Sequence, residues 1–404
     1  MKEKKAPEIR FKGFTDDWEQ RKLSELVERY DDPVETPHDG YIRLGIRSHA
    51  KGTFHEYVEP GHELETAQMH RVAANKLIFN ITFAWEHAVA ITDKNDAGKL
   101  VSHRFPQFTL LDLIRPEFLK YVILDEDFHH NLYLASPGGA GRNRVLKIDE
   151  ALDYPIYYPS VDEQHKIGVF LDKLSDLITL HQRKHKKLLS VKKSMLEKMF
   201  PQNGAKVPEI RFEGFTDDWE QRKLDTITDV RDGTHDSPQY VETGHPFITS
   251  KNVKDGFINY EDIQYVSDKD YEEINKRSKV DKNDILMGMI GTIGNIALVR
   301  ETPDFAIKNV ALIKDIGDVY YRYLYHCLQS NSVAHQLDDN LDGGTQKFIA
   351  LNKIRELVIP VPSEHEQHKI GDYMESLDNL ITLHQRELDK LVNIKKSMLE
   401  KMFV

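Results

Sequence analysis

Five segments of the chain combine glycine with arginine, lysine and small polar side chains, which are the residue types that contact nucleic acid. Arg, Asn, Gln, Ser and Thr side chains hydrogen-bond to base edges and phosphates, and glycine lets a backbone N–H approach a phosphate closely. In the first half of the chain the candidates are Arg43, Arg47, Ser48, His49, Lys51, Arg142, Asn143 and Arg144. In the second half they are Arg231, Thr234, His235, Lys251, Asn252, Lys254, Thr345, Gln346 and Lys347. We predict that these side chains bind DNA. Loops of the same composition also occur as plain solvated surface, which is the alternative for each of them.

Sequence motifs for catalysis are missing. The chain has no Asn-Pro-Pro-Tyr-like tetrapeptide of the kind found in amino-methyltransferases, and no GxxxxGK[ST] phosphate loop. Gly288, Gly291 and Gly294 are not spaced as a dinucleotide fingerprint. No second histidine pair stands at ligand spacing beside His129 and His130, and the chain has a single cysteine. We therefore predict a non-catalytic chain with no cofactor and no metal site of its own.

The charge of the chain limits how it can bind DNA. Its 404 residues include 55 Lys and Arg against 66 Asp and Glu, which gives a net charge of −11. Because proteins that bind nucleic acid alone usually carry a basic excess, we expect the isolated chain to bind DNA weakly, through local basic loops or with a basic partner. No apolar run approaches the roughly 20 residues that cross a bilayer, and no secretory signal is visible. A cytoplasmic location is the expectation.

The segments that must position these loops occur twice in the sequence. Pro7–Leu23 recurs as Pro208–Leu224 with a single difference, Lys12 against Glu213, and Glu163–Phe200 recurs as Glu366–Phe403 in less strict form. We call these four repeated segments the frame. Residues 28–160 and 229–362, between the frame segments, share little sequence, and we call them the inserts. Duplication followed by uniform drift would blur frame and inserts alike, so the pattern favours one job done twice by the frame and two different jobs done by the inserts.

The later frame segments predict two long helices, residues 161–200 and 363–404. They lack internal proline, are rich in good helix formers, and would each be roughly 57 Å long. Apolar residues recur at alternating steps of three and four, which is typical of a coiled coil. We predict an antiparallel pair whose seam includes Leu174, Leu177, Leu377 and Leu380, with Lys184 of one helix meeting Glu387 of the other. The alternative is two helices that each pack on their own domain.

The inserts predict mixed helix and strand structure. Residues 76–81, 88–91, 284–290 and 296–299 resemble strands, 117–124 and 319–330 resemble helices, and each insert closes on a strand that ends in proline. We predict an α+β protein with two mixed α/β recognition domains joined by the helix pair, related by a pseudo-twofold repeat. The expected boundaries are a first domain at 1–160, a helix at 161–200, a linker at 201–206, a second domain at 207–362 and a second helix at 363–404.

The frame resembles that of the specificity subunits of type I restriction-modification systems over essentially the whole chain. The resemblance rests on the Trp18 segment and on the helix motifs Glu163-Gln164-His165-Lys166-Ile167-Gly168 and Glu366-Gln367-His368-Lys369-Ile370-Gly371. Gly343–Phe348 also resembles the end of many family recognition domains, whereas Gly141–Arg144 departs from that pattern and leaves the contacts there open.

The resemblance implies a division of labour. Each insert would be a target recognition domain that reads one half of a bipartite DNA sequence, and the coiled coil would set the spacing of the two halves. Two methyltransferase subunits with S-adenosylmethionine would dock on the frame. Restriction subunits with ATP and Mg would join them, so adenine methylation and cleavage would belong to these partners.

Two other readings remain open at this stage. The chain can be a stand-alone DNA-binding regulator with two recognition domains, or a coiled-coil scaffold that does not bind DNA. Co-purification with a methyltransferase subunit separates the first reading from the main one.

Overall fold

The computed structural model describes residues 6–63, 68–138, 144–202, 204–254, 256–291, 293–341, 343 and 347–404. The chain divides into two compact units. Unit 1 comprises residues 1–181 and 387–404, and unit 2 comprises residues 182–386. Each unit therefore contains one insert and a stretch of both long helices.

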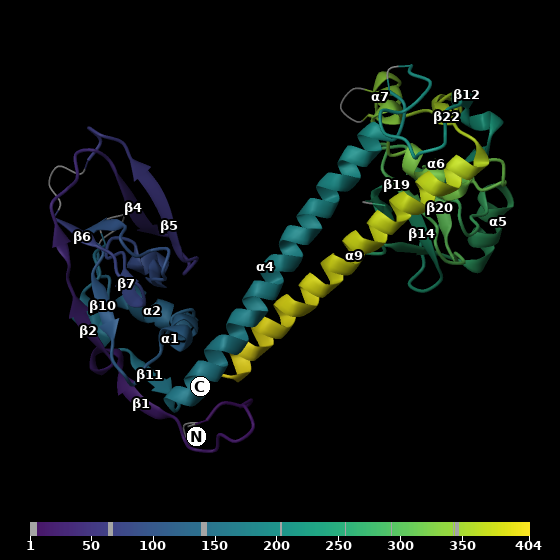
Figure 1. The fold of residues 1–404 in the computed structure, drawn as a ribbon. Helices are drawn as coiled ribbons and strands as arrows, with labels where there is room; N and C mark the ends of the chain where they lie inside the picture. The colour runs from purple at the N-terminus through teal and green to yellow at the C-terminus, as the bar shows by residue number, and fades with distance from the viewer. Residues whose placement is uncertain are drawn as a thin grey trace. The chain divides into compact units, whose positions relative to one another are not determined.

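Both long helices expected from the sequence are present (Figure 1). Helix α4 spans Val161–Lys198 and helix α9 spans Glu364–Lys401, each with 38 residues. Pro201 follows α4 and cannot continue it. In unit 1 the first half of α4 shares a core with the end of α9, and in unit 2 the end of α4 shares a core with the first half of α9. The helices therefore run antiparallel, which confirms the predicted helix pair and the mixed α and β fold class.

Unit 1 is built from short strands and short helices. Its strands are β1 (Glu19–Lys22), β2 (Val27–Tyr30), β3 (Pro33–Val34), β4 (Tyr41–Ile46), β5 (Thr53–Val58), β6 (Met69–Arg71), β7 (Lys76–Phe79), β8 (Val89–Ile91), β9 (Leu100–Ser102), β10 (Gln107–Leu110) and β11 (Pro155–Tyr158). Its short helices are η1 (Leu23–Glu25), η2 (Ala84–Glu86), α1 (Pro116–Val122), α2 (Glu126–Leu134) and α3 (Ile148–Leu152). The strands form a sheet in the order β2-β10-β7-β8, a second sheet in the order β3-β6-β9-β4-β5, and the pair β1-β11.

Unit 2 has a similar inventory. Its strands are β12 (Glu220–Lys223), β13 (Asp229–Asp232), β14 (His245–Thr249), β15 (Val253–Lys254), β16 (Phe257–Ile258), β17 (Gln264–Val266), β18 (Ile285–Gly288), β19 (Ile296–Leu298), β20 (Ala306–Lys308), β21 (Val310–Lys314) and β22 (Val358–Val361). Its short helices are η3 (Leu224–Thr226), η4 (Ser250–Asn252), α5 (Asp268–Ser278), α6 (Tyr321–Cys327), α7 (Asn331–Asp339) and α8 (Leu351–Arg355). The sheets are β13-β21-β18-β19, β17-β14-β20, β12-β22 and β15-β16.

The two units share the topology of the four-stranded sheet and of three strands in the second sheet, although their inserts differ in sequence. The order β2-β10-β7-β8 corresponds to β13-β21-β18-β19, and all pairs in these two sheets are antiparallel. In the second sheets, β4 runs parallel to β9 and antiparallel to β5, just as β14 runs parallel to β20 and antiparallel to β17. Sheet hydrogen bonds are made by the backbone, so this order can persist while the side chains change. The inserts are thus two versions of one domain.

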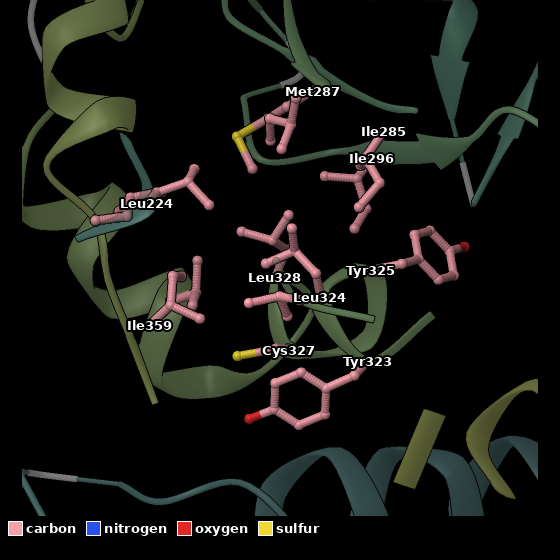
Figure 2. Close-up of a cluster of buried hydrophobic side chains, with 14 of the residues drawn as sticks. Leu224, Ile285, Met287, Ile296, Tyr323, Leu324, Tyr325, Cys327, Leu328 and Ile359 are labelled. Atoms are coloured by element: carbon pink, nitrogen blue, oxygen red, sulfur yellow. The ribbon is translucent and has the colours of Figure 1, made fainter. Parts of the chain in front are cut away.

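Each unit has its own apolar core beneath the four-stranded sheet. In unit 2 this core joins β18 and β19 to α6, to the frame residue Leu224 and to Ile359 of β22 (Figure 2). Cys327 lies inside this core, and burial raises the pKa of its thiol to about 12. The thiol therefore stays protonated and acts as a small apolar side chain.

Candidate nucleic-acid interface

In each unit an arginine of the early frame segment holds a buried glutamate of a long helix. Arg10 donates from Nε and Nη2 to the two carboxylate oxygens of Glu163, at 2.9 and 2.6 Å. Arg211 does the same to Glu366, at 2.7 and 2.8 Å. Both glutamate side chains are 1% exposed. Two-point pairing of this kind fixes the orientation of both groups, so the early frame segment is clamped to the start of each helix.

The glutamine that follows each glutamate connects the helix to the insert. The side chain of Gln164 accepts a hydrogen bond from the Arg115 N–H at 2.9 Å, and that of Gln367 accepts one from the Tyr320 N–H at 2.9 Å. Gly168, one turn further on, has no room for a side chain, because a Cβ there would lie 2.6 Å from the carbonyl oxygen of Glu117. The motif shared by the two helices is therefore explained by how it seats the insert.

The end of α9 packs in unit 1, and the end of α4 packs in unit 2. Phe403, just after α9, stacks on Phe118 of unit 1 with ring centroids 5.4 Å apart. Phe200, just after α4, lies 5.7 Å from the ring of Tyr323 in unit 2. The Ile9 N–H donates to Lys401 O, and the Ile210 N–H donates to Lys198 O, each at 2.9 Å. One frame thus completes both units in the same way.

The seam of the helix pair differs from the predicted one. Leu174 and Leu377 are 7% exposed and belong to the cores of units 1 and 2, and their place in the helix seam stays a prediction. Leu177 and Leu380 are 42% and 44% exposed, so their placement in the seam was wrong. The less exposed positions that follow are Ile178, His181, His185 and Leu188 in α4, and Ile381, His384, Leu388 and Leu391 in α9.

The reason is a one-residue shift of the three–four pattern. The next partly buried apolar residue after Leu174 is Ile178, and after Leu377 it is Ile381, so the step is four residues where the prediction had three. The shift arises because the helix residues up to Leu174 and Leu377 pack on the insert core. Lys184 is exposed under this register and Glu387 is partly buried. The pairing of Lys184 with Glu387 stays a prediction.

The candidate residues of the first basic loop are gathered around one hollow in unit 1. This hollow, of about 590 Å³, lies beside the β4-β5 hairpin and is lined by all five predicted residues, Arg43, Arg47, Ser48, His49 and Lys51. Phe54, Phe83 and Phe105 supply its apolar wall. The Arg47 guanidinium lies 5.2 Å from the centre of the Phe54 ring, a cation–π arrangement that holds it in place. The hollow therefore combines cationic, hydrogen-bonding and flat apolar groups.

The loop at residues 47–52, which borders this hollow, is hydrogen-bonded to η2 and to His87. The Ser48 hydroxyl donates to the Glu86 carboxylate at 2.6 Å, and the N–H groups of His49 and Ala50 donate to Glu86 O and His87 O at 2.7 and 2.8 Å. His49 and Ala50 have φ angles of 60° and 48°, in the left-handed region, and Gly52 has a φ of 78°. Arg43 is engaged by Glu56 at 2.5 Å. The loop has a defined shape, with Lys51 exposed beside it.

Arg144 packs against Trp85 of η2. Its guanidinium covers the rings of Tyr133 and Trp85, with centroids 4.4 and 5.7 Å away, and donates to the Tyr133 hydroxyl at 3.1 Å. The neighbouring candidates Arg142 and Asn143 lie outside the described residues.

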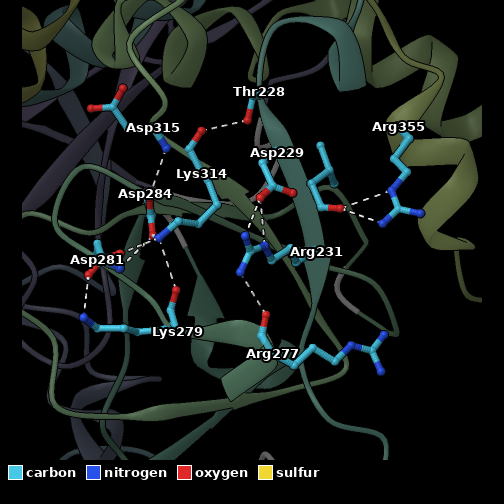
Figure 3. A network of polar contacts seen from close by, with 11 residues as sticks. Thr228, Asp229, Arg231, Arg277, Lys279, Asp281, Asp284, Lys314, Asp315 and Arg355 are labelled. Atoms are coloured by element: carbon cyan, nitrogen blue, oxygen red, sulfur yellow. Dashed lines mark hydrogen bonds and ion pairs between the residues drawn. The ribbon is translucent and has the colours of Figure 1, made fainter. Parts of the chain in front are cut away.

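In unit 2 the candidate arginine belongs to a polar network on β13 (Figure 3). Arg231 donates from Nε to Asp229 at 2.8 Å and from Nη1 to the carbonyl oxygen of Arg277 at 3.2 Å. Next to it, Lys314 bridges the carboxylates of Asp281 and Asp284, both at 2.7 Å. Arg231 and its partner Asp229 are both on β13, and the Arg231 side chain remains partly exposed.

His235 lies just after this strand between two oxygen acceptors. Its Nδ1 is 2.8 Å from Asn309 Oδ1, and its Nε2 is 2.9 Å from Asp232 Oδ2. The hydrogen bond with Asn309, joined by that with Asp232, raises the pKa of His235 above its ordinary value. The adjacent Thr234 accepts a hydrogen bond from the Asp236 N–H at 3.1 Å, which shapes the turn. Both contacts therefore favour the protonated, cationic form of the His235 ring.

The remaining candidates of unit 2 differ in their exposure. Asn252 is 2% exposed, and its amide is hydrogen-bonded to Thr249 and to Asn259 O, so it shapes its loop and presents no surface to a ligand. Lys251 donates to Asp262 O at 3.1 Å. Lys254 and Lys347 are exposed. Thr345 and Gln346 lie outside the described residues.

Several exposed groups near the candidates were not predicted. In unit 1 these are Ile42 and Tyr57, whose side chains are exposed on the β4-β5 hairpin. In unit 2 they are Arg277, which is paired with Asp232, and Lys308, which donates to the Ser237 hydroxyl at 2.6 Å. An alternating strand pattern that leaves large apolar side chains on the outer face is the signal that points to the first pair. The second pair has no local signal, because the fold brings it to Asp232 and Ser237.

No helix among the described residues is long and apolar enough to cross a membrane.

Comparisons with known proteins agree with one another. The family model described as type I restriction modification DNA specificity domain matches residues 216–393. The chain is 24% identical over 270 residues to the type I restriction enzyme MjaVIII specificity subunit of Methanocaldococcus jannaschii, a match that covers 63% of this chain and 61% of that protein. It is 22% identical to the putative type I restriction enzyme MjaX specificity subunit of the same organism, over 95% of this chain and 92% of that protein.

A solved structure shares the fold. It is the type I restriction-modification system S subunit from M. genitalium, with a TM-score of 0.57 and 16% identity over 99% of each chain. The match to the first of the two sequence relatives spans about three fifths of that relative's length, and the family model falls mainly on unit 2.

Proposed function

We propose that the chain belongs to the family of type I restriction modification DNA specificity proteins and is the DNA-specificity subunit of such a system. The observation that carries the proposal is one frame that seats two inserts of the same topology and different surface chemistry. A repeated frame suits a partner that docks twice, and two unlike inserts suit two unlike halves of a DNA target. In this proposal residues 1–160 and 207–362 are the two target recognition domains, joined through the helices at 161–200 and 363–404 with a linker at 201–206.

We propose that DNA contacts come from the exposed groups of the inserts. In unit 1 they surround the hollow by the β4-β5 hairpin, where a guanidinium held over a ring keeps a fixed direction for bidentate contact with a base edge or phosphate. The proposed contacts there are Arg43, Arg47, Ser48, His49 and Lys51, with Arg144 against Trp85 of η2. In unit 2 they are Arg231, Thr234, His235, Lys251, Lys254 and Lys347. Arg142, Asn143, Thr345 and Gln346 remain proposed contacts from sequence. Asn252 is assigned to loop shape.

The chain needs partners to act, in this proposal. Its net charge of −11 and its carboxylate-paired arginines, Arg43 and Arg231, oppose tight binding of the isolated chain to a polyanion. Two methyltransferase subunits that bring S-adenosylmethionine, one per copy of the frame, would enclose the DNA and supply positive charge. Restriction subunits with ATP and Mg would complete the complex. Adenine methylation and cleavage belong to those subunits, and this chain contributes specificity without catalysis, in the cytoplasm.

A stand-alone DNA-binding regulator is the second candidate. It would use the same inserts but would need no partner on the frame. Purification of the tagged chain from its host distinguishes the two, because a specificity subunit brings a methyltransferase subunit with it at a fixed ratio and a regulator does not.

Methylome sequencing tests the proposal in cells. Deletion of the gene is expected to abolish one bipartite adenine-methylation motif, and expression of the wild-type chain from a plasmid restores it. An unchanged methylome in the deletion strain refutes the proposal.

A further inference from the structure

His326 is a buried histidine whose ring has no hydrogen-bond partner. It lies in α6 and is 0% exposed, and neither Nδ1 nor Nε2 is within hydrogen-bond distance of a protein group among the described residues. Buried polar atoms are nearly always paired, because an unpaired one has lost its hydrogen bonds to water and gained none in return. A bound ligand would satisfy the unpaired ring nitrogens of His326.

Two carboxylates of α9 face this ring. Glu375 Oε2 is 4.0 Å from His326 Nε2, too far for a hydrogen bond. Asp378 lies one turn further along α9, and the ligand atoms of the three residues all lie within 4.8 Å of one another. An ion bound at about 2.1 Å from nitrogen and oxygen ligands needs neighbouring ligand atoms at most about 4.2 Å apart, so small side-chain movements bring the three groups to that range. All three residues belong to unit 2.

In unit 1 the position that corresponds to His326 is Tyr121, and its side chain has hydrogen-bond partners. Arg115 and Tyr320 occupy equivalent places, since each N–H binds the frame glutamine, and six residues after them come Tyr121 and His326. The Tyr121 hydroxyl donates to Asp172 at 2.6 Å and lies 3.3 Å from the Ser175 hydroxyl. Asp172 and Ser175 are the frame equivalents of Glu375 and Asp378. The longer tyrosine therefore fills the space in unit 1 that the shorter histidine leaves in unit 2.

We propose that His326, Glu375 and Asp378 bind a divalent first-row transition-metal ion of the zinc class. One imidazole nitrogen with two carboxylates is a ligand set that these ions accept, whereas Mg²⁺ and Ca²⁺ favour oxygen ligands alone. The replacement of Ser175 by Asp378 adds the second carboxylate only in the unit that has the histidine. The ion would tie α6 to α9, so its effect is to stabilise unit 2.

The protonation state of the imidazole suits this role. Burial, together with the charges of Lys192, Arg300 and Arg322, holds the pKa of His326 well below its ordinary value. The ring is therefore neutral at physiological pH, and one nitrogen keeps the lone pair that a metal ligand needs.

Arg300 and Lys192 already pair with the two carboxylates, so a metal ion would compete with these cations for the carboxylate oxygens. Arg300 pairs with Glu375 mainly through Oε1, while its contact with Oε2, the oxygen nearest the histidine, is 3.2 Å. Lys192 binds Asp378 at 2.6 Å and also donates to Gln329 at 3.1 Å. Lys192 and Gln329 also line a hollow of about 490 Å³ in unit 2. Lys192 therefore competes with the metal and must turn toward Gln329 when the metal enters.

Calorimetric titration of the chelator-treated full chain with Zn²⁺ tests the proposal. We expect one site per chain, a higher unfolding temperature of the Zn²⁺-loaded chain, and no such effect of Mg²⁺. His326→Tyr copies the arrangement of unit 1 and is expected to abolish the site. The matched control is His335→Tyr, the same change at an exposed position of α7, which should bind Zn²⁺ as the wild-type chain does.

A second variant keeps the test decisive where His326→Tyr fails to fold. Lys192→Gln removes the competing cation and is expected to tighten Zn²⁺ binding at least tenfold. Zn²⁺ binding by His326→Tyr equal to that of wild type overturns the proposal, as does a wild-type chain without a stoichiometric Zn²⁺ site. Unchanged affinity in Lys192→Gln overturns it too.

Discussion

Arg10 and Glu163 lie 153 residues apart in the chain and form a two-point ion pair, with N···O distances of 2.9 and 2.6 Å. The side chains are 13% and 1% exposed, and Arg211 and Glu366 repeat the pair in unit 2. The guanidinium of Arg10 also reaches the carbonyl oxygen of Asp16 at 2.7 Å. This pair fixes the early frame segment to the long helix on which each insert is seated.

Loss of the Arg10 side chain is therefore expected to destabilise unit 1. Arg10→Met leaves the Glu163 carboxylate buried and unpaired, which costs about 3–5 kcal/mol. Urea unfolding of the full chain, with the midpoint read from tryptophan fluorescence, measures the effect. Arg21→Met is the control, since Arg21 and Glu19 form an exposed pair worth at most about 1 kcal/mol. A loss of less than about 1 kcal/mol for Arg10→Met, matching the control, would contradict this account of the frame.

The register of the long helices gives a second prediction. Leu174 is in the unit 1 core and Leu177, three residues on, is largely exposed. Leu174→Ala is expected to cost about 2–5 kcal/mol of unfolding free energy, because it leaves a cavity, and Leu177→Ala less than about 1 kcal/mol. Leu377→Ala and Leu380→Ala repeat the comparison in unit 2. Equal losses for Leu174→Ala and Leu177→Ala would restore the seam predicted from the heptad pattern.

The sequence predicts the large features of this fold because the repeat and the helix periodicity are properties of local sequence. The long helices, the strands around residues 76–91 and 284–299, and the closing strands at 155–158 and 358–361 all lie within a few residues of their expected places. The seam was displaced at Leu177 and Leu380 because apolar spacing does not tell which residues pack on the insert and which on the other helix. The common topology of the inserts was hidden for a related reason, since strand order is set by backbone pairing over long sequence separations.

The site could be predicted only in part. Arg43, Arg47, Ser48, His49 and Lys51 lie around one hollow because they follow one another in a single loop. Asn252 was chosen for its residue type, whereas its environment turns its amide inward to Thr249 and Asn259. The partners of Arg43 and Arg231, which temper their charge, come from fold and strand geometry that residue type alone does not reveal.

The titration of His235 provides a third prediction. Asn309 Oδ1 and Asp232 Oδ2 both favour the protonated ring, so the pKa of His235 in the folded chain lies above its ordinary value of 6.5. Its contribution to stability is then fully present below pH 6.5 and is lost as the pH rises through the higher folded-state pKa. NMR titration of the ring protons measures this, and Asn309→Ala should lower the midpoint while Asn259→Ala leaves it unchanged. A midpoint at or below 6.5 in the wild-type chain would refute the expectation.

The hollow of unit 1 gives a fourth prediction, for the chain assembled with its methyltransferase partner. Arg47→Ala removes a guanidinium held over Phe54 and is expected to weaken binding to the cognate DNA by about 1–3 kcal/mol, which is roughly 5- to 150-fold. Loss of one phosphate contact also makes the salt dependence shallower by about one unit. Fluorescence anisotropy at several salt concentrations measures both. Lys147→Ala, which alters an exposed cation paired with Glu150 on α3, is the control, and equal binding by the two variants would exclude Arg47 from the interface.

Exchange of one insert tests the central proposal most directly. Residues 28–160 are replaced by the corresponding insert of a specificity subunit with a known target, the frame is left intact, and the methylome of cells that carry the hybrid and its methyltransferase is sequenced. We predict a methylated bipartite motif in which one half changes to that of the donor while the other half is retained. A motif changed in both halves, or changed in neither, would contradict independent reading of the two half-sites by the two inserts.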